Sequence, residues 1–201
     1  MGMILWLNGS FGAGKTTVAY ELQRRLEKAF VYDPENMGYF LRKNAPEECR
    51  TDDFQDVPLW RNFNYETLKW IAGTYPGVIL VPMTINRQAY FDEVIGRLAM
   101  DGVLVRHVIL QADRDTLLKR LKKRSLGRLS REEFAVRAID RSLAFFATRS
   151  KGEKIVTDNL TVNQVVEQVA ERCALLLRED ARSPWKRSLD RTVTLLKHIR
   201  R

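Results

Sequence analysis

Eight consecutive residues, Gly9 to Thr16, have the types and spacing of a phosphate-binding loop. They read Gly-Ser-Phe-Gly-Ala-Gly-Lys-Thr and match the pattern G-x-x-x-x-G-K-T at every fixed position. The apolar run Met3 to Leu7 precedes the loop and a helical pattern follows it. This strand, loop and helix context distinguishes the motif from an accidental glycine-rich turn. The segment therefore predicts a binding site for a nucleoside triphosphate.

The residue types in this loop explain how it would hold phosphate. Glycines allow backbone N–H groups to curve around phosphate oxygens, and the helix that follows adds the positive end of its dipole. The ammonium of Lys15 can reach the β- and γ-phosphates, and the hydroxyl of Thr16 can coordinate Mg²⁺. We expect these residues to bind the nucleotide: Gly9, Ser10, Phe11, Gly12, Ala13, Gly14, Lys15 and Thr16.

Asp33 follows a second apolar run, Phe30 to Tyr32, and would lie beside the loop because the carboxyl ends of parallel strands share one edge. Its carboxylate could accept the proton of an attacking hydroxyl or hold a water on Mg²⁺. It could instead cap the helix that begins near Pro34. The third apolar run ends in Pro82-Met83-Thr84 without an acidic residue, which gives Asp33 more weight.

Other polar and aromatic residues could line a site for a phosphate acceptor. Thr84 and Arg87 follow the third run and could project into such a pocket, or Thr84 could cap the helix that contains Arg87. Asp52 and Asp53 could touch substrate or metal. The aromatic residues between 54 and 70 could form a mobile wall over the acceptor, but for most of them core packing of an amphipathic helix is the favoured interpretation.

A cluster of cations could form a lid over the nucleotide, at about residues 119–131. No acidic residue lies among residues 116–131, and the cluster comprises Lys119, Arg120, Lys122, Lys123, Arg124, Arg128 and Arg131. Arginines there could neutralise the charge that develops during phosphoryl transfer, and Arg137 and Arg141 could also face the nucleotide. The alternative is a solvated basic face. Main-chain groups of residues 157–159 could contact the base, and Thr161 with Gln164 fits a capping box.

Apolar runs of strand length alternate with helical patterns, which is typical of an α/β fold with a parallel sheet. The predicted strands lie near 3–8, 30–33, 77–82, 103–111 and 154–157. The predicted helices lie near 15–28, 36–43, 58–74, 87–100, 113–125, 131–147 and 162–178. In the last of these, an apolar stripe runs from Val162 to Leu176.

The composition is that of one globular domain with a short appendage. The chain has 201 residues, of which 45% are hydrophobic and 29% are charged. The two cysteines and two histidines are far apart in sequence, so we expect neither a disulfide framework nor a protein metal site. With no signal-like or spanning segment, the pattern favours a cytoplasmic location.

The last residues differ in charge from the body, because residues 181–201 carry +6 of the net charge of +9. After the linker 180–184, a basic amphipathic helix is predicted over 184–201, with an apolar stripe of Trp185, Leu189, Val193, Leu196 and Ile199. This pattern suits an anionic bilayer, or the helix could fold back and bury its stripe on the body. It lacks the interleaved aromatic residues of a nucleic-acid groove, so a nucleic-acid-binding ATPase is the remote alternative.

Several blocks resemble the bacterial tunicamycin-resistance protein family across nearly the whole chain. They are Leu5 to Thr16, Val31 to Gly38, Asp52 to Gln55, Pro58 to Arg61, Val81 to Ile85, Ile95 to Leu98, Thr116 to Leu121 and Thr157 to Leu160. The resemblance implies a P-loop fold of five parallel strands over 1–180, akin to shikimate and nucleoside-monophosphate kinases. It also implies ATP binding, resistance to the nucleoside antibiotic tunicamycin and peripheral attachment to the inner face of the cell membrane.

The resemblance also assigns roles to residues. It extends the ATP site to Thr17 and places Asp33 at the catalytic carboxylate of related small-molecule kinases. Arg120 and Arg124 match their adenine-stacking and lid arginines. Pro82-Met83 replaces the glycine pair of shikimate kinases, so the acceptor need not be a similar sugar acid. Two activities follow as expectations, namely phosphorylation of a tunicamycin-like nucleoside or ATP-dependent sequestration of the antibiotic at the membrane. The oligomeric state is not predicted.

Overall fold

Five parallel strands form one sheet in the order β2-β3-β1-β4-β5. The strands are β1 (Met3–Gly9), β2 (Ala29–Val31), β3 (Val78–Pro82), β4 (Leu104–Gln111) and β5 (Glu153–Val156). The computed structural model describes residues 2–125, 129–148 and 152–199, with backbone only at 124–125, 129–135 and 195–199. In the register of the central strand, Leu5 lies between Leu80 and Arg106. The predicted parallel sheet is confirmed.

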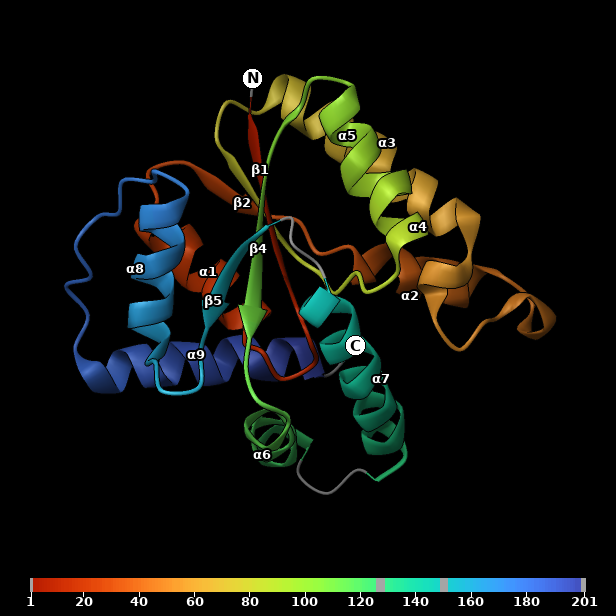
Figure 1. The fold of residues 1–201 in the computed structure, drawn as a ribbon. Coiled ribbons are helices and arrows are strands. Elements are labelled where there is room, and N and C mark those ends of the chain that lie inside the picture. The colour runs from red at the N-terminus through yellow and green to blue at the C-terminus, as the bar shows by residue number, and fades with distance from the viewer. Residues whose placement is uncertain (1, 126–128, 149–151, 200–201) are drawn as a thin grey trace.

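Helices cover both faces of the sheet (Figure 1). They are α1 (Lys15–Arg25), α2 (Glu35–Asn44), α3 (Pro58–Thr74), α4 (Gln88–Phe91), α5 (Arg97–Met100), α6 (Arg114–Ser125), α7 (Leu129–Thr148), α8 (Val162–Arg172) and α9 (Pro184–Ile199). The short 3-10 turns are η1 (Glu47–Cys49) and η2 (Phe54–Asp56). Among the described residues, no helix is long and apolar enough to cross a membrane.

Alternate residues of β1 face two separate apolar layers, as the two-residue period of a strand requires. Leu5 and Leu7 pack with α1 and α8, whereas Ile4 and Trp6 pack with α3 and the helical segment after β3. All four side chains are buried. Both faces of the sheet are therefore apolar, which leaves the carboxyl edge of the strands as the place where polar groups gather.

Two predicted helices differ from the structure. The helix expected over 87–100 is interrupted by a π-helical turn, η3 (Asp92–Gly96), between α4 and α5. Its extra residue accompanies the burial of the adjacent Val94 and Ile95 against the sheet. The helix expected to reach 178 ends at Arg172, because Ala174 takes a left-handed conformation and the N–H of Leu175 returns to the carbonyl of Ala170. Leu176, expected in the stripe, is 92% exposed.

The C-terminal helix α9 lies across α1 and is held there by a buried carboxylate. Glu21 of α1 is 1% exposed. Its oxygens lie 2.5 Å from Arg182 Nη2, 3.1 Å from Arg24 Nη1 and 3.4 Å from Arg191 Nε. Arg182 also pairs with Asp180 and Asp190, and its hydrogen bonds lower the pKa of Asp180 to about 2. The segment predicted as a linker is therefore an anchor.

The described side chains of α9 divide between two faces, and the polar face meets the body. Thr194 is buried and accepts a hydrogen bond from Arg24, while Arg191 donates to Asn163 of α8. Trp185, Leu189 and Val193 are 69%, 52% and 43% exposed. The helix thus folds back, but these residues of the predicted stripe are not buried on the body. Leu196 and Ile199 lie outside the described side chains.

Glu21→Gln is expected to lower the free energy of unfolding by about 3 kcal/mol, because it removes the charge that three guanidinium groups share in a buried site. Equilibrium urea denaturation measures this loss. Glu167→Gln is the matched control, because the Glu167 carboxylate pairs with Arg25 at 3.4 Å but its side chain is 58% exposed. Equal losses in both variants would show that the cluster does not stabilise the docked helix.

Candidate nucleotide and acceptor site

The phosphate loop joins β1 to α1 and has a backbone that only glycine satisfies at its start. Gly9 has φ of 139°, and a Cβ there would lie 2.4 Å from the carbonyl oxygen of Leu110. At Gly12, with φ of 80°, a Cβ would lie 2.9 Å from the carbonyl oxygen of Leu117 on α6. The loop is therefore packed closely against β4 and α6, and its shape is fixed before any ligand arrives.

Groups that suit phosphate gather at the start of α1. Gly14 is the N-cap of this helix and provides no side-chain cap, while the place of its absent Cβ faces open space. The first-turn N–H groups and the helix dipole suit an anion there. Ser10 Oγ is buried and has no hydrogen-bond partner among the described residues. These features fit a nucleotide phosphate chain. Thr16 lies in the first turn of α1, and its contact with Mg²⁺ stays a prediction.

Lys15 folds over the loop. Its Nζ donates to the carbonyl oxygens of Gly9 and Ser10, each at 2.9 Å, and lies 5.8 Å from the centre of the Phe11 ring. These contacts hold the ammonium above the loop, near where phosphates would bind. Among the described residues, no group of three or more His, Cys, Asp or Glu side chains could form a metal site of its own.

Thr84 neither projects into an acceptor pocket nor caps the following helix, the two roles that the sequence allows. It is buried, and its Oγ1 donates to the carbonyl oxygen of Gly9 at 2.7 Å. It does not cap α4, whose N-cap is Arg87 without a side-chain hydrogen bond. Asn8 adds two main-chain bonds to Ile85, next to Thr84. The loop after β3 is therefore bonded to the phosphate loop. In the sequence, the one indication of this contact is that the polar Asn8 follows directly after the apolar run Met3 to Leu7.

Asp33 lies two residues beyond β2, at the carboxyl edge of the sheet. Its Oδ1 accepts a hydrogen bond from the N–H of Glu35 at 3.0 Å, so it closes a turn where α2 begins. The neighbouring Tyr32 donates to Asn64, and burial raises the pKa of Tyr32 to about 12. The turn thus fixes the direction of an otherwise mobile carboxylate. The N-cap of α2 is Pro34, without a side-chain cap hydrogen bond, so Asp33 closes a turn just before the helix rather than capping it as predicted. The catalytic role of Asp33 stays a prediction.

The loop before α3 supplies a polar cluster that the sequence did not single out. Asp56 Oδ1 accepts from Arg87 Nη1 and from the hydroxyl of Tyr90, both at 2.6 Å. Burial and the hydrogen bond to Asp56 raise the pKa of Tyr90. Asp53, a candidate ligand, instead accepts from the N–H of Gln55 and caps η2. Arg87, a candidate for the acceptor pocket, is therefore tied to a carboxylate.

The aromatic residues of this region divide between the core and the surface. Trp60 is fully buried and donates to the carbonyl of Pro34, and Phe54 packs against it with ring centres 5.4 Å apart. Phe63 and Trp70 are 39% and 68% exposed on α3. Core packing therefore accounts for the first pair, whereas the second pair faces solvent.

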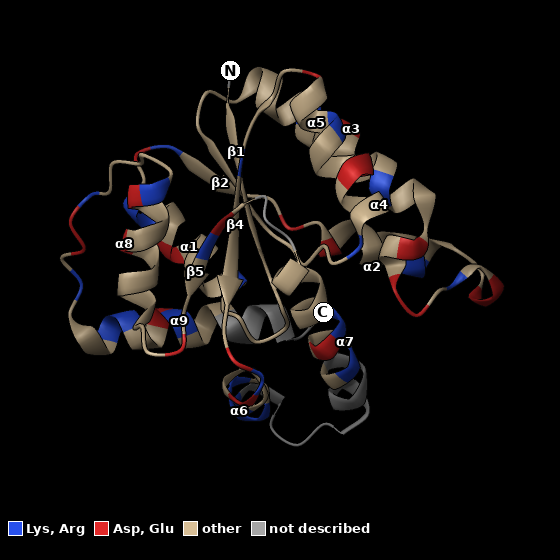
Figure 2. Ribbon diagram, viewed as in Figure 1, with Lys and Arg blue, Asp and Glu red and all other residues tan. Residues whose placement is uncertain are grey.

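Arg120 joins α6 to the end of β5. Its guanidinium donates to Thr157 Oγ1 at 3.0 Å and to the carbonyl of Thr157 at 2.7 Å. Asp158 accepts from the N–H of Asp113 at 2.9 Å, so residues 157–158 are held at the edge where a base was expected. The side chains of Arg124 and Arg131, and all of Arg128, lie outside the described residues. Figure 2 marks the described basic residues of α6 as blue segments of its ribbon.

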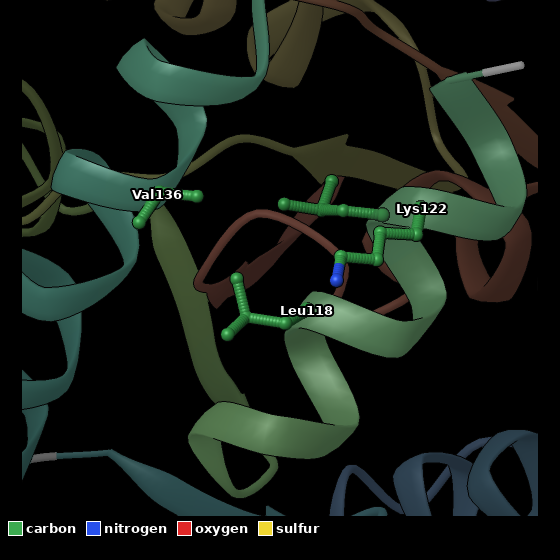
Figure 3. Close-up of a pocket in the computed structure, with 4 residues that line it drawn as sticks. Leu118, Lys122 and Val136 are labelled. Carbon is green, nitrogen blue, oxygen red and sulfur yellow. The ribbon is translucent and has the colours of Figure 1, made fainter. Parts of the chain in front are cut away.

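A small apolar cavity of about 40 Å³ lies between α6 and α7. Figure 3 shows Leu118 and Lys122 of α6 facing Val136 of α7 across it. Leu121 completes its lining. Its volume is close to that of one water molecule, so it is a packing gap beside the lid segment and cannot hold an acceptor.

Residues 4–148 match the family model described as an AAA domain. The tunicamycin resistance protein of Deinococcus radiodurans is 30% identical, with 90% of this chain and 100% of that chain aligned and a TM-score of 0.75. This chain belongs to the tunicamycin-resistance protein family. No protein among those with curated descriptions matches the sequence.

More distant members of the same fold are small-molecule kinases. The APS kinase of Mycobacterium tuberculosis, solved with AMPPNP and APS, is 16% identical, with 86% of this chain and 98% of that chain aligned and a TM-score of 0.59. The shikimate kinase of Bacteroides thetaiotaomicron is 21% identical, with 86% and 99% aligned and a TM-score of 0.55. These likenesses place this family member in the P-loop kinase fold, as expected from the sequence.

Proposed function

We propose that the chain is an ATP-dependent phosphotransferase whose acceptor is a hydroxyl of a tunicamycin-like nucleoside. The carrying observation is the position of Asp33, which a turn fixes at the carboxyl edge of β2 while the phosphate loop opens at the same edge. A fixed carboxylate beside a nucleotide site is what a general base requires. Membership of the tunicamycin-resistance family supports this acceptor class.

In this proposal the chain's own residues divide the work. Lys15 leaves the carbonyl oxygens of Gly9 and Ser10 for the phosphates, and Thr84 keeps the Gly9 carbonyl satisfied when it does. Asp33 takes the proton of the acceptor hydroxyl. Arg120, already held at the end of β5, keeps α6 and the lid segment beside the nucleotide. Mg²⁺, when bound through Thr16, would neutralise phosphate charge.

Mass spectrometry of tunicamycin incubated with the protein and Mg-ATP tests the activity. A product heavier by one phosphoryl group supports the transferase. Binding of tunicamycin in the presence of ATP, with no change in its mass after prolonged incubation with excess protein, would reject catalysis. Sequestration would then remain as the function.

A second candidate, ATP-dependent sequestration of the antibiotic at the inner face of the membrane, is favoured by the outward side chains of α9. A helix that presents Trp185, Leu189 and Val193 to solvent, with the exposed Lys186 beside them, has the pattern of a helix lying in a bilayer interface. We therefore propose that α9 contacts anionic lipid through this face. Sequestration at the membrane requires this contact, whereas phosphoryl transfer is compatible with it.

Replacing Trp185, Leu189 and Val193 together by serine is expected to abolish co-sedimentation with anionic liposomes, since the variant keeps the basic residues but loses the apolar face. Deletion of 184–201 should have the same effect while sparing ATP binding. The matched control replaces Leu59, Phe63 and Trp70 on α3 by serine, because these are also exposed. Loss of sedimentation in both triple variants, or none in either, would contradict a membrane role for α9.

A further inference from the structure

Asn8, the last side chain before the phosphate loop, has its orientation fixed by main-chain hydrogen bonds. Its Oδ1 accepts from the N–H of Gly9 at 2.9 Å and from the N–H of Ile85 at 3.0 Å, and its Nδ2 donates to the carbonyl of Ile85 at 3.0 Å. If Oδ1 and Nδ2 of Asn8 were exchanged, the amide nitrogen would face two backbone N–H groups and the amide oxygen would face a carbonyl oxygen, so all three hydrogen bonds would be lost. The remaining Nδ2 hydrogen therefore belongs to the contact with His107.

His107 Nε2 lies 3.1 Å from Asn8 Nδ2. Because Nδ2 can only donate, Nε2 must accept, which requires a neutral imidazole with its proton on Nδ1. We propose that neutral His107 positions the phosphate loop through Asn8, and that protonation of His107 weakens nucleotide binding. The inference rests on the proposed nucleotide site.

Protonation would place an N–H on Nε2 directly against the amide N–H of Asn8. The imidazole has little room to withdraw, since the Phe91 ring is 5.1 Å away and a Cβ on Gly152 would lie 2.8 Å from Nδ1. If Asn8 turns instead, it gives up its bonds to Gly9 and Ile85. The Gly9 N–H is bound directly by the Asn8 side chain. The Gly9 carbonyl is bound by Thr84, whose neighbour Ile85 is itself held by Asn8, so this contact depends on Asn8 indirectly. The entry of the phosphate loop would then loosen.

The charged groups around His107 come from the elements packed beside it. On the same face of the sheet, Lys154 of β5 lies in register with Ile109, and its ammonium donates to the carbonyl of Phe146. On η3, Asp92 accepts from Gln88, and Glu93 accepts from Arg61. Arg106 and Glu153 fall on the opposite face by strand alternation. A proton on His107 therefore adds positive charge to the face that already carries Lys154.

The test measures Mg-ATP affinity by isothermal titration from pH 8 to pH 5.5 in four proteins. Wild type and His198→Gln, which removes the other histidine, should lose about tenfold more affinity across this range than His107→Gln, on the scale of one lost buried hydrogen bond. Glutamine can accept from Asn8 through Oε1 without titrating. His107→Leu cannot accept and should bind weakly throughout, with its fold checked by circular dichroism. Protonation of ATP changes the affinity equally in all four proteins, so it cancels when they are compared.

Two outcomes would overturn the inference separately from the nucleotide site. The first is that both wild type and His107→Gln bind Mg-ATP at pH 8 and that their affinities then change with pH in the same way. The second is a ¹⁵N spectrum of His107 with the proton on Nε2 at pH 8. Absence of Mg-ATP binding by wild type at pH 8 would instead overturn the nucleotide site and this inference together.

Discussion

Lys15→Ala is expected to weaken Mg-ATP binding by at least about a hundredfold, the scale of losing two charged hydrogen bonds to phosphate. The domain should remain folded, because the ammonium lies over the loop rather than in the core. Its loss leaves the Gly9 carbonyl bound by Thr84. Isothermal titration measures the affinity, and urea denaturation measures the stability.

The control for this variant is Lys28→Ala, an exposed lysine beyond the other end of α1 whose ammonium lies over the Tyr75 ring. It should bind Mg-ATP as the wild type does. Wild-type affinity in Lys15→Ala would reject the assignment of the phosphate loop, whatever the result for stability.

Asp33→Asn is expected to lower phosphoryl transfer by about a hundredfold or more, the contribution of a general base, while ATP binding stays close to normal. The amide oxygen can still accept the N–H of Glu35, so the turn at the start of α2 should persist. It cannot take the proton of an acceptor hydroxyl. Single-turnover transfer of ³²P from ATP to the acceptor measures the effect.

Asp53→Asn is a closely matched control, because Asp53 Oδ1 accepts the N–H of the residue two positions on, Gln55, at the same 3.0 Å as Asp33 Oδ1 accepts that of Glu35. If both variants transfer at the wild-type rate, Asp33 only closes the turn before α2. If only Asp53→Asn is slow, the base lies in the loop before α3.

Features that depend on neighbouring residues in the sequence were predicted well. The phosphate loop, the five strands and the capping box of α8 are each coded locally, and Thr161 and Gln164 exchange both hydrogen bonds of that box. The predicted strands match because apolar runs mark strands that are buried on both faces. The family, expected from the motif blocks, is confirmed by the comparison with the Deinococcus protein, and the kinase fold by the likeness to solved small-molecule kinases.

Features that depend on distant residues were not predictable in the same way. Thr84 reaches a carbonyl 75 residues away, and Arg120 reaches a residue 37 positions on. Nothing in the helical period of residues 184–199 says that its charged face meets α1, because that requires Glu21 to be buried beneath it. Hydrophobic patterning identifies a face but not what it packs against.

The charge cluster at Glu21 has a consequence for the thermodynamics of any contact that α9 makes. Many amphipathic helices are unstructured until they bind their target, and the entropy lost in ordering the backbone then opposes binding. Here the ion pairs of Arg182 and Arg191 hold the helix in place on the domain. The entropy of ordering is thus lost during folding rather than during association. The outer face of α9 is therefore a preorganised surface, and the ordering of this helix does not oppose its binding to a partner.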